Sequence, residues 1–92
     1  MHQSVNFPPV NLSPIDEIED IRRRMRVSNL EARLALHEID AEALSHEISS
    51  PMTSVPKREE AIQRRESALN EVSAIKAALD KMYRSFPHLA RH

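Results

Sequence analysis

The C-terminal half of the chain places a seam residue at alternating intervals of four and three positions. Side chains at these intervals share one face of an α-helix, so the pattern predicts a long helix with a single apolar stripe. The stripe is apolar except for one arginine. Its members are Ala61, Arg65, Ala68, Val72, Ile75, Leu79, Met82 and Phe86. Such a helix needs one partner helix to cover it, as in a coiled coil.

The N-terminal half carries two apolar stripes, more than a third of a turn apart around one predicted helix. The first comprises Val27, Leu30, Leu34, His37, Ala41, Leu44 and Ile48. The second comprises Ile18, Ile21, Met25, Ala32, Leu36, Ile39 and Ala43. The chain offers only one other helix, so one stripe is left for something outside the hairpin. Periodicity alone does not say which stripe faces the second helix.

Prolines and capping residues set the expected bounds of the first helix. Ser13 suits the N-cap and Pro14 the first helical position, so the helix is expected over residues 13–49. Pro51 cannot continue it. Residues 1–12 lack periodicity and contain a Pro-Pro pair, which predicts an extended or disordered N-terminal arm.

The second helix is expected after a proline-containing turn at residues 50–56. It should run over residues 57–86 and end before Pro87, which leaves residues 87–92 as a C-terminal tail. The fold class is therefore all-α: an antiparallel hairpin of two long helices, completed to a four-helix bundle by dimerisation or by a partner. The absence of glycine argues against β-hairpins, which use glycine in their turns.

Composition also excludes several kinds of site. The chain has no cysteine, so disulfides and thiolate metal sites are absent, and we expect neither a metal nor a cofactor. No stretch approaches the roughly 20 apolar residues that a membrane span requires. The carboxylate pairs lie on a thin hairpin without a cleft, and there is no nucleophile elbow or phosphate-binding loop. We expect a cytoplasmic protein that is not an enzyme and does not enter the membrane.

The surplus apolar stripe indicates protein–protein interaction as the function, in an adaptor, chaperone or regulator. The stripe is expected to bind a protein partner or a second copy of the chain. The residues assigned to this surface are Ile18, Ile21, Met25, Leu36, Ile39 and Ala43.

One basic cluster supports an alternative function, in which a dimeric helical hairpin binds nucleic acid. The arginines that could contact phosphates are Arg22, Arg23, Arg26 and Arg33. Acids four positions earlier, Glu19 and Asp20, favour a solvated helix face instead. The net charge of −1 and the lack of an aromatic platform also make nucleic acid the less favoured partner.

Overall fold

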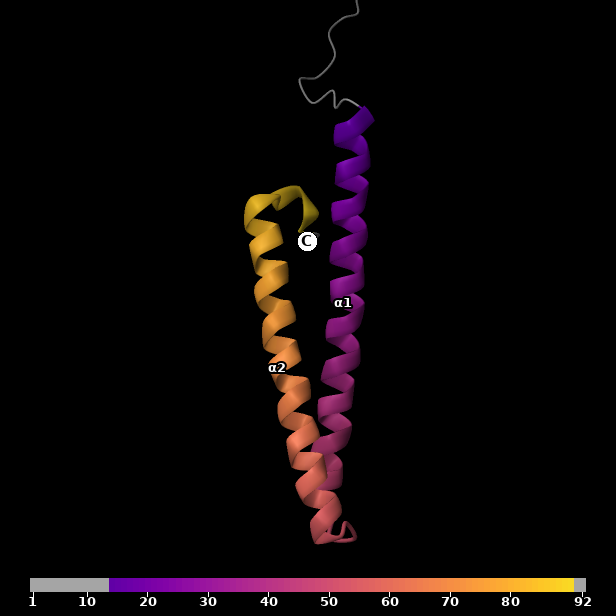
Figure 1. The fold of residues 1–92 in the computed structure, drawn as a ribbon, viewed down its shortest axis with the longest axis vertical. Helices are drawn as coiled ribbons and strands as arrows, with labels where there is room; N and C mark the ends of the chain where they lie inside the picture. Colours follow the sequence, from indigo (N-terminus) through magenta and orange to yellow (C-terminus); the bar gives the residue numbers. More distant parts are fainter. Residues whose placement is uncertain (1–13, 91–92) are drawn as a thin grey trace, which may run out of the picture.

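The computed structural model describes residues 14–90, and these residues form an antiparallel helical hairpin (Figure 1). Helix α1 spans Pro14–Ser49, helix α2 spans Val55–Ser85, and a short 3₁₀ helix, η1, spans Pro87–Leu89. No strand occurs in the described part of the chain. The prediction of an all-helical hairpin is confirmed. The expected arm at 1–12 and the expected N-cap, Ser13, lie outside the described residues.

Helix α2 begins at Val55, two residues before the expected start. The hydroxyl of Ser54 caps it by accepting a hydrogen bond from the backbone N–H of Lys57 at 3.4 Å. Pro56 fits the first turn because the N–H that proline lacks would have no partner there. The helix ends at Ser85, and the backbone N–H of Phe86 closes it on the carbonyl of Met82 at 2.8 Å.

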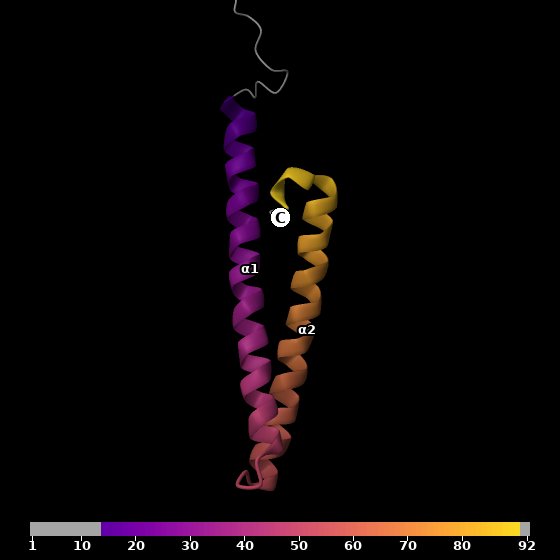
Figure 2. The same ribbon diagram turned by 180° about the vertical axis from the view of Figure 1, so that it is seen from behind.

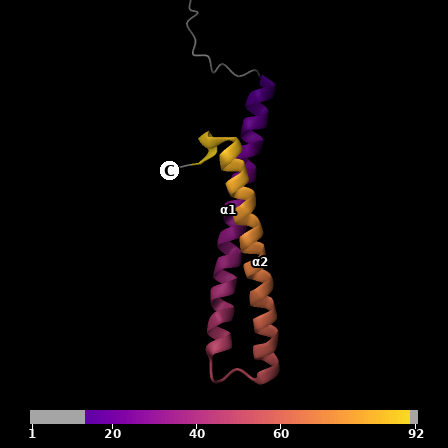
Figure 3. The same cartoon turned by 90° about the vertical axis from the view of Figure 1, so that its left-hand side faces the viewer.

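In the turn between the helices, an arginine satisfies the carbonyls that a glycine cap commonly satisfies. The last carbonyls of a helix have no partner within it, and a glycine cap commonly satisfies them. Here the Arg58 guanidinium donates to the backbone carbonyls of Ile48, Ser50 and Thr53, each at 3.1 Å. The Thr53 hydroxyl donates to the carbonyl of Glu47 at 2.7 Å. Arg58 thus fixes the tight connection at the bottom of the hairpin (Figure 3).

The seam between α1 and α2 buries the first of the two α1 stripes. The buried seam residues are Val27, Ala41 and Leu44 of α1 and Ala61, Ala68, Val72, Ile75 and Leu79 of α2. Alanines dominate the buried seam near the turn, and larger residues dominate it near the open end. The structure therefore decides the choice that periodicity left open.

Polar contacts flank the seam along its length. Arg65, the charged member of the α2 stripe, stays exposed and donates from Nε to the Ser45 hydroxyl at 2.7 Å. Two ion pairs of 3.7 Å cross between the helices on opposite flanks: Arg33 with Glu71, and Lys76 with Glu38. All four of those side chains are at least half exposed, so each pair contributes little to stability on its own.

The segment expected to be a C-terminal tail folds back onto the open end of the hairpin. After Phe86 the chain turns across the gap between the helices and forms η1 (Figure 1). Leu89 is only 3% exposed and joins a core cluster with Val27, Ile75 and Leu79. The expectation of a tail over residues 87–92 missed this contribution to the core.

Replacing Leu89 with Ala should destabilise the hairpin by about 2–3 kcal/mol, the lower part of the range for buried leucines, because the core is narrow. Urea unfolding followed by circular dichroism measures the change. Leu69→Ala is the matched control, since Leu69 is 38% exposed. Equal losses in the two variants would show that Leu89 does not seal the open end.

Candidate protein-binding face

The second α1 stripe is exposed along its whole length. We call it the outer stripe: Ile18, Ile21, Met25, Ala32, Leu36, Ile39 and Ala43. Ile18 and Ile21 are 50% and 55% exposed, Met25 is 60% exposed, and Leu36 and Ile39 are each 66% exposed. The structure thus places all six residues predicted for partner binding on an open surface.

The outer stripe points away from α2. Met25 and Ile39 each lie two positions before a buried seam residue, Val27 and Ala41, which corresponds to about 200° of rotation around the helix. In both face views, no other described element runs along that side of α1 (Figures 1 and 2). At 1.5 Å per residue the stripe is about 38 Å long.

The other exposed large apolar side chains, which include Val55 at the start of α2, are more scattered. On α2, Ile62 and Leu69 are exposed on a flank of the seam, seven residues apart. Ile15 lies at the start of α1, and Met52 lies in the turn. Isolated exposed apolar residues are common on protein surfaces, whereas a continuous row of them marks an interaction site. The outer stripe is therefore the candidate site.

Three of the four predicted arginines line one groove near the open end of the hairpin. Arg22, Arg23 and Arg26 of α1 face Lys81 of α2 across this groove, which encloses about 560 Å³. Its remaining lining comes from Ala78, Met82, Ser85 and Phe86. Sequence analysis missed Lys81, because only the hairpin register brings that lysine beside the arginines.

The arginines differ in how far they are engaged within the chain. The Arg23 guanidinium lies over the Phe86 ring, 4.1 Å from its centre, and contacts Glu19 at 3.4 Å. Arg33 does not line the groove and pairs with Glu71. Within residues 14–90, Arg22 and Arg26 make no hydrogen bond or ion pair. Of the predicted basic face, only Arg22 and Arg26 remain without a partner in the described residues, and Lys81 lies across the groove from them.

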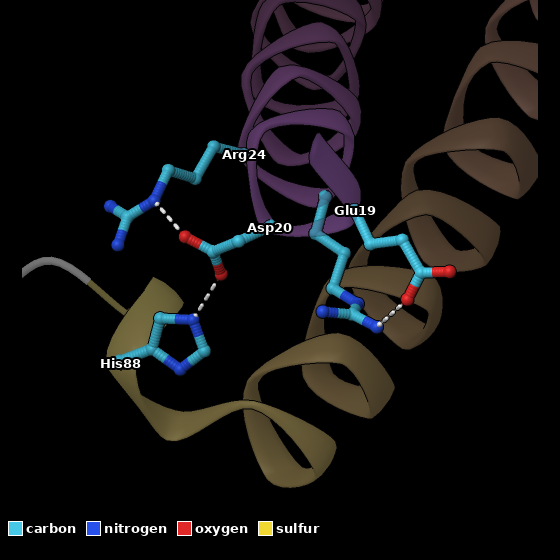
Figure 4. A network of polar contacts seen from close by, with 5 residues as sticks. Glu19, Asp20, Arg24 and His88 are labelled. Carbon is cyan, nitrogen blue, oxygen red and sulfur yellow. Dashed lines mark hydrogen bonds and ion pairs between the residues drawn. The ribbon is translucent and has the colours of Figure 1, made fainter. Parts of the chain in front are cut away.

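A polar clasp joins α1 to η1 beside this groove (Figure 4). The Asp20 carboxylate accepts a hydrogen bond from Arg24 Nε at 2.8 Å, and His88 Nε2 lies 2.6 Å from its other oxygen. The Phe86 and His88 rings meet edge to face, with centroids 6.3 Å apart. The hydrogen bond from Arg24, followed by that from His88, lowers the pKa of Asp20. Spacing predicted the Asp20–Arg24 pair, but not the contact with His88.

Comparison with protein-family models, with curated proteins and with solved structures yields no match for the chain. Neither α1 nor α2 is long and apolar enough to cross a membrane. Among residues 14–90, no three histidine or acidic side chains gather as ligands for a metal ion. The exposed surface of α1 is therefore the feature that indicates a function.

Replacing Asp20 with Asn should flatten the acid dependence of stability. Arg24 and His88 hold the folded-state pKa of Asp20 below its ordinary value of 3.8. The charged carboxylate therefore stabilises the folded chain above that pH, and this stabilisation disappears as the pH falls through the lowered folded-state value. Wild type should lose its advantage over Asp20→Asn between about pH 5 and pH 2, as measured by urea unfolding.

Asp80→Asn is the matched control for this experiment. Asp80 pairs at 2.6 Å with Arg84 of the same helix and does not bridge to another element. We expect that variant to keep most of the acid dependence of the wild type. An equal flattening in both variants would contradict a particular role for the clasp.

Proposed function

We propose that the chain is a small, non-enzymatic protein–protein interaction protein of the cytoplasm, acting as an adaptor, chaperone or regulator. It works by burying the outer stripe of α1 against a protein partner or a second copy. One observation carries the proposal: five large apolar side chains, each at least 50% exposed, lie in one row on the side of α1 that α2 leaves open.

The energetics indicate how much of the stripe a partner must cover. Fully burying a Leu, Ile or Met side chain contributes roughly 1.5–3 kcal/mol, and about half to two thirds of each of these residues is still exposed. Five of them supply on the order of 5–10 kcal/mol, while association itself costs roughly 4–15 kcal/mol. Contact with one end of the stripe is therefore too weak. The partner has to present a long apolar surface parallel to α1, as a helix does.

Nucleic-acid binding is the second candidate function, and the groove formed by Arg22, Arg26 and Lys81 is the feature that favours it. Phosphate binding depends on a row of free cations. Here Arg23 and Arg33 are already engaged by Glu19 and Glu71. An apolar stripe also contributes nothing to phosphate binding. Protein binding therefore accounts for more of the exposed surface.

The proposal assigns no catalytic step to the chain. Catalytic side chains usually sit in concave, mostly enclosed pockets that shift their pKa values towards the reaction they perform. The adjacent acids Glu19 and Asp20 instead pair with neighbouring cations at the surface of the hairpin. Their contacts serve the structure of the open end.

Replacing Leu36 and Ile39 together with Ser should abolish binding without unfolding the hairpin. Wild type should sediment as more than one copy, or retain a stoichiometric partner from a lysate of its native cells. The double variant should do neither, while its circular dichroism melting curve stays that of a folded, monomeric hairpin. Ile62→Ser/Leu69→Ser on α2 is the matched control and should behave as wild type.

Salt separates the two candidate functions. Binding through apolar surface should persist when NaCl rises from about 0.05 to 0.2 M, whereas binding to several phosphates should weaken by orders of magnitude. A wild-type chain that stays monomeric and captures nothing would refute the proposed function. Loss of binding in the α2 control variant alone would place the binding site on α2 and contradict its assignment to α1.

A further inference from the structure

We propose that the occupant of the outer stripe is a second copy of this chain, docked antiparallel with its twofold axis close to Ala32. The proposal rests on the function proposed above and specifies the partner. Each α1 helix then lies between its own α2 and the α1 of the other copy. Four long helices result, with both apolar stripes of α1 covered.

Part of the outer stripe matches itself when it is inverted about Ala32. Ile18, Ile21 and Met25 lie at one end, Leu36 and Ile39 lie at the other, and Ala32 is between them. With the axis at Ala32, Met25 of one copy faces Ile39 of the other, and Ile21 faces Ala43. The small residue at the axis lets the two helix backbones approach closely. Between Ile21 and Ala43 the stripe therefore matches an inverted copy of itself except at Leu36, which faces Ser28, and Ile18 faces His46 beyond the end of the stripe.

The flanks of the outer stripe carry matching charges. In an antiparallel pair each flank meets the same flank of the other copy. One flank holds Arg22, Arg26 and Asp40, and the axis at Ala32 places Asp40 of the second copy between the two arginines. On the opposite flank Arg24 falls between Glu38 and Glu42 of the second copy. Each interface half thus repeats the same alternation of acid and base.

The order of charges along α1 also selects the antiparallel orientation. Residues 22–26 contain four arginines and no acid, whereas residues 38–47 contain four acids and no lysine or arginine. A parallel pair would set arginines beside arginines and acids beside acids. The antiparallel pair sets each basic segment beside an acidic one, and such complementarity fixes partner orientation.

The charges needed on one flank of this docking are free within the hairpin, whereas on the other flank Arg24 already pairs with Asp20 and Glu38 with Lys76. In the described part of the chain, Arg22, Arg26 and Asp40 have no hydrogen bond or ion pair. Near the axis, Glu31 would approach Glu31 of the other copy, and Arg33 would approach Arg33 of the other copy. Those two are already drawn towards α2, because Glu31 accepts from the Tyr83 hydroxyl at 2.9 Å and Arg33 pairs with Glu71 at 3.7 Å.

A charge exchange tests the proposed docking. Arg26→Glu and Asp40→Arg should each weaken self-association of the full chain by at least about tenfold, since each puts like charges together twice per dimer. An equimolar mixture should bind more tightly than either variant alone and regain most of the lost affinity, because the mixed dimer restores both attractive pairs between positions 26 and 40. Sedimentation equilibrium measures all three. Arg64→Glu and Glu60→Arg on α2 are the charge-matched controls and should leave the Kd unchanged.

Cysteine cross-linking tests the orientation, because the chain has no cysteine of its own. Under oxidation, Ile21→Cys mixed with Ala43→Cys should form a disulfide-linked dimer in high yield. Ile21→Cys alone should not, because its two cysteines would lie about 33 Å apart in the antiparallel dimer. Met25→Cys mixed with Ile39→Cys provides a second pair.

Two results would overturn the proposal. Efficient self-linking of Ile21→Cys would show a parallel dimer and refute the antiparallel docking. A wild-type chain that stays monomeric at high concentration would refute the second copy as occupant. If that monomer still binds another protein and Leu36→Ser/Ile39→Ser abolishes the binding, the proposed function stands and only the identity of the partner is wrong.

Discussion

Two helices share only one interface, and this limit governs the whole structure. Helix α2 has one apolar stripe and buries most of it against α1. Helix α1 has two stripes of comparable apolar content, with five large apolar residues in each, so the hairpin can satisfy only half of it. The exposed face of α1 is a direct consequence of that imbalance. Burial of this face against another molecule would supply favourable free energy that the hairpin alone does not gain.

The short turn explains why α2 covers the stripe that it does. The turn ends at Ser54, so α2 must begin packing next to the C-terminal end of α1. The seam stripe extends to Ile48, beside the turn, whereas the outer stripe ends at Ala43. Packing on the outer stripe would leave the first turns of α2 without apolar contacts. The position of a stripe relative to the turn, more than its hydrophobicity, therefore decides which face is buried.

Sequence reasoning predicted the hairpin because its signals are local. Stripe periodicity and prolines identify long helices without reference to distant residues, and they placed the outer stripe residues on one helix face. The choice between the stripes needed the length and position of the turn. That information is present in the sequence, since Leu44 and Ile48 belong to only one stripe.

The parts that sequence reasoning missed are contacts between distant segments. Leu89 enters the core only because η1 crosses the open end, and His88 reaches Asp20 for the same reason. Lys81 joins the arginines only through the register of the seam. No periodicity marks these residues, because each depends on where the chain returns after α2.

The charges of α1 carry a cost that the hairpin does not relieve. Like charges four positions apart on a helix are destabilising by a few tenths of a kcal/mol. Arg23 and Arg24 are offset by acids one turn earlier, but Arg22 and Arg26 are such a like-charged pair, and neither has an acidic partner within the described residues. Glu38 and Glu42 repeat the arrangement with opposite sign, and only Glu38 is offset, by Lys76.

These two strained pairs lie at similar distances on either side of Ala32, at opposite ends of the exposed apolar stripe. Removing either charge pair would make an isolated α1 more stable, so the hairpin itself gives no physical reason for them. Each pair can be offset by one opposite charge of a second copy. Inversion about Ala32 places Asp40 of the second copy between Arg22 and Arg26, and it places Arg24 between Glu38 and Glu42 of the second copy. The same inversion sets Met25 opposite Ile39 and Ile21 opposite Ala43, so the charged flanks and the apolar stripe fit one axis.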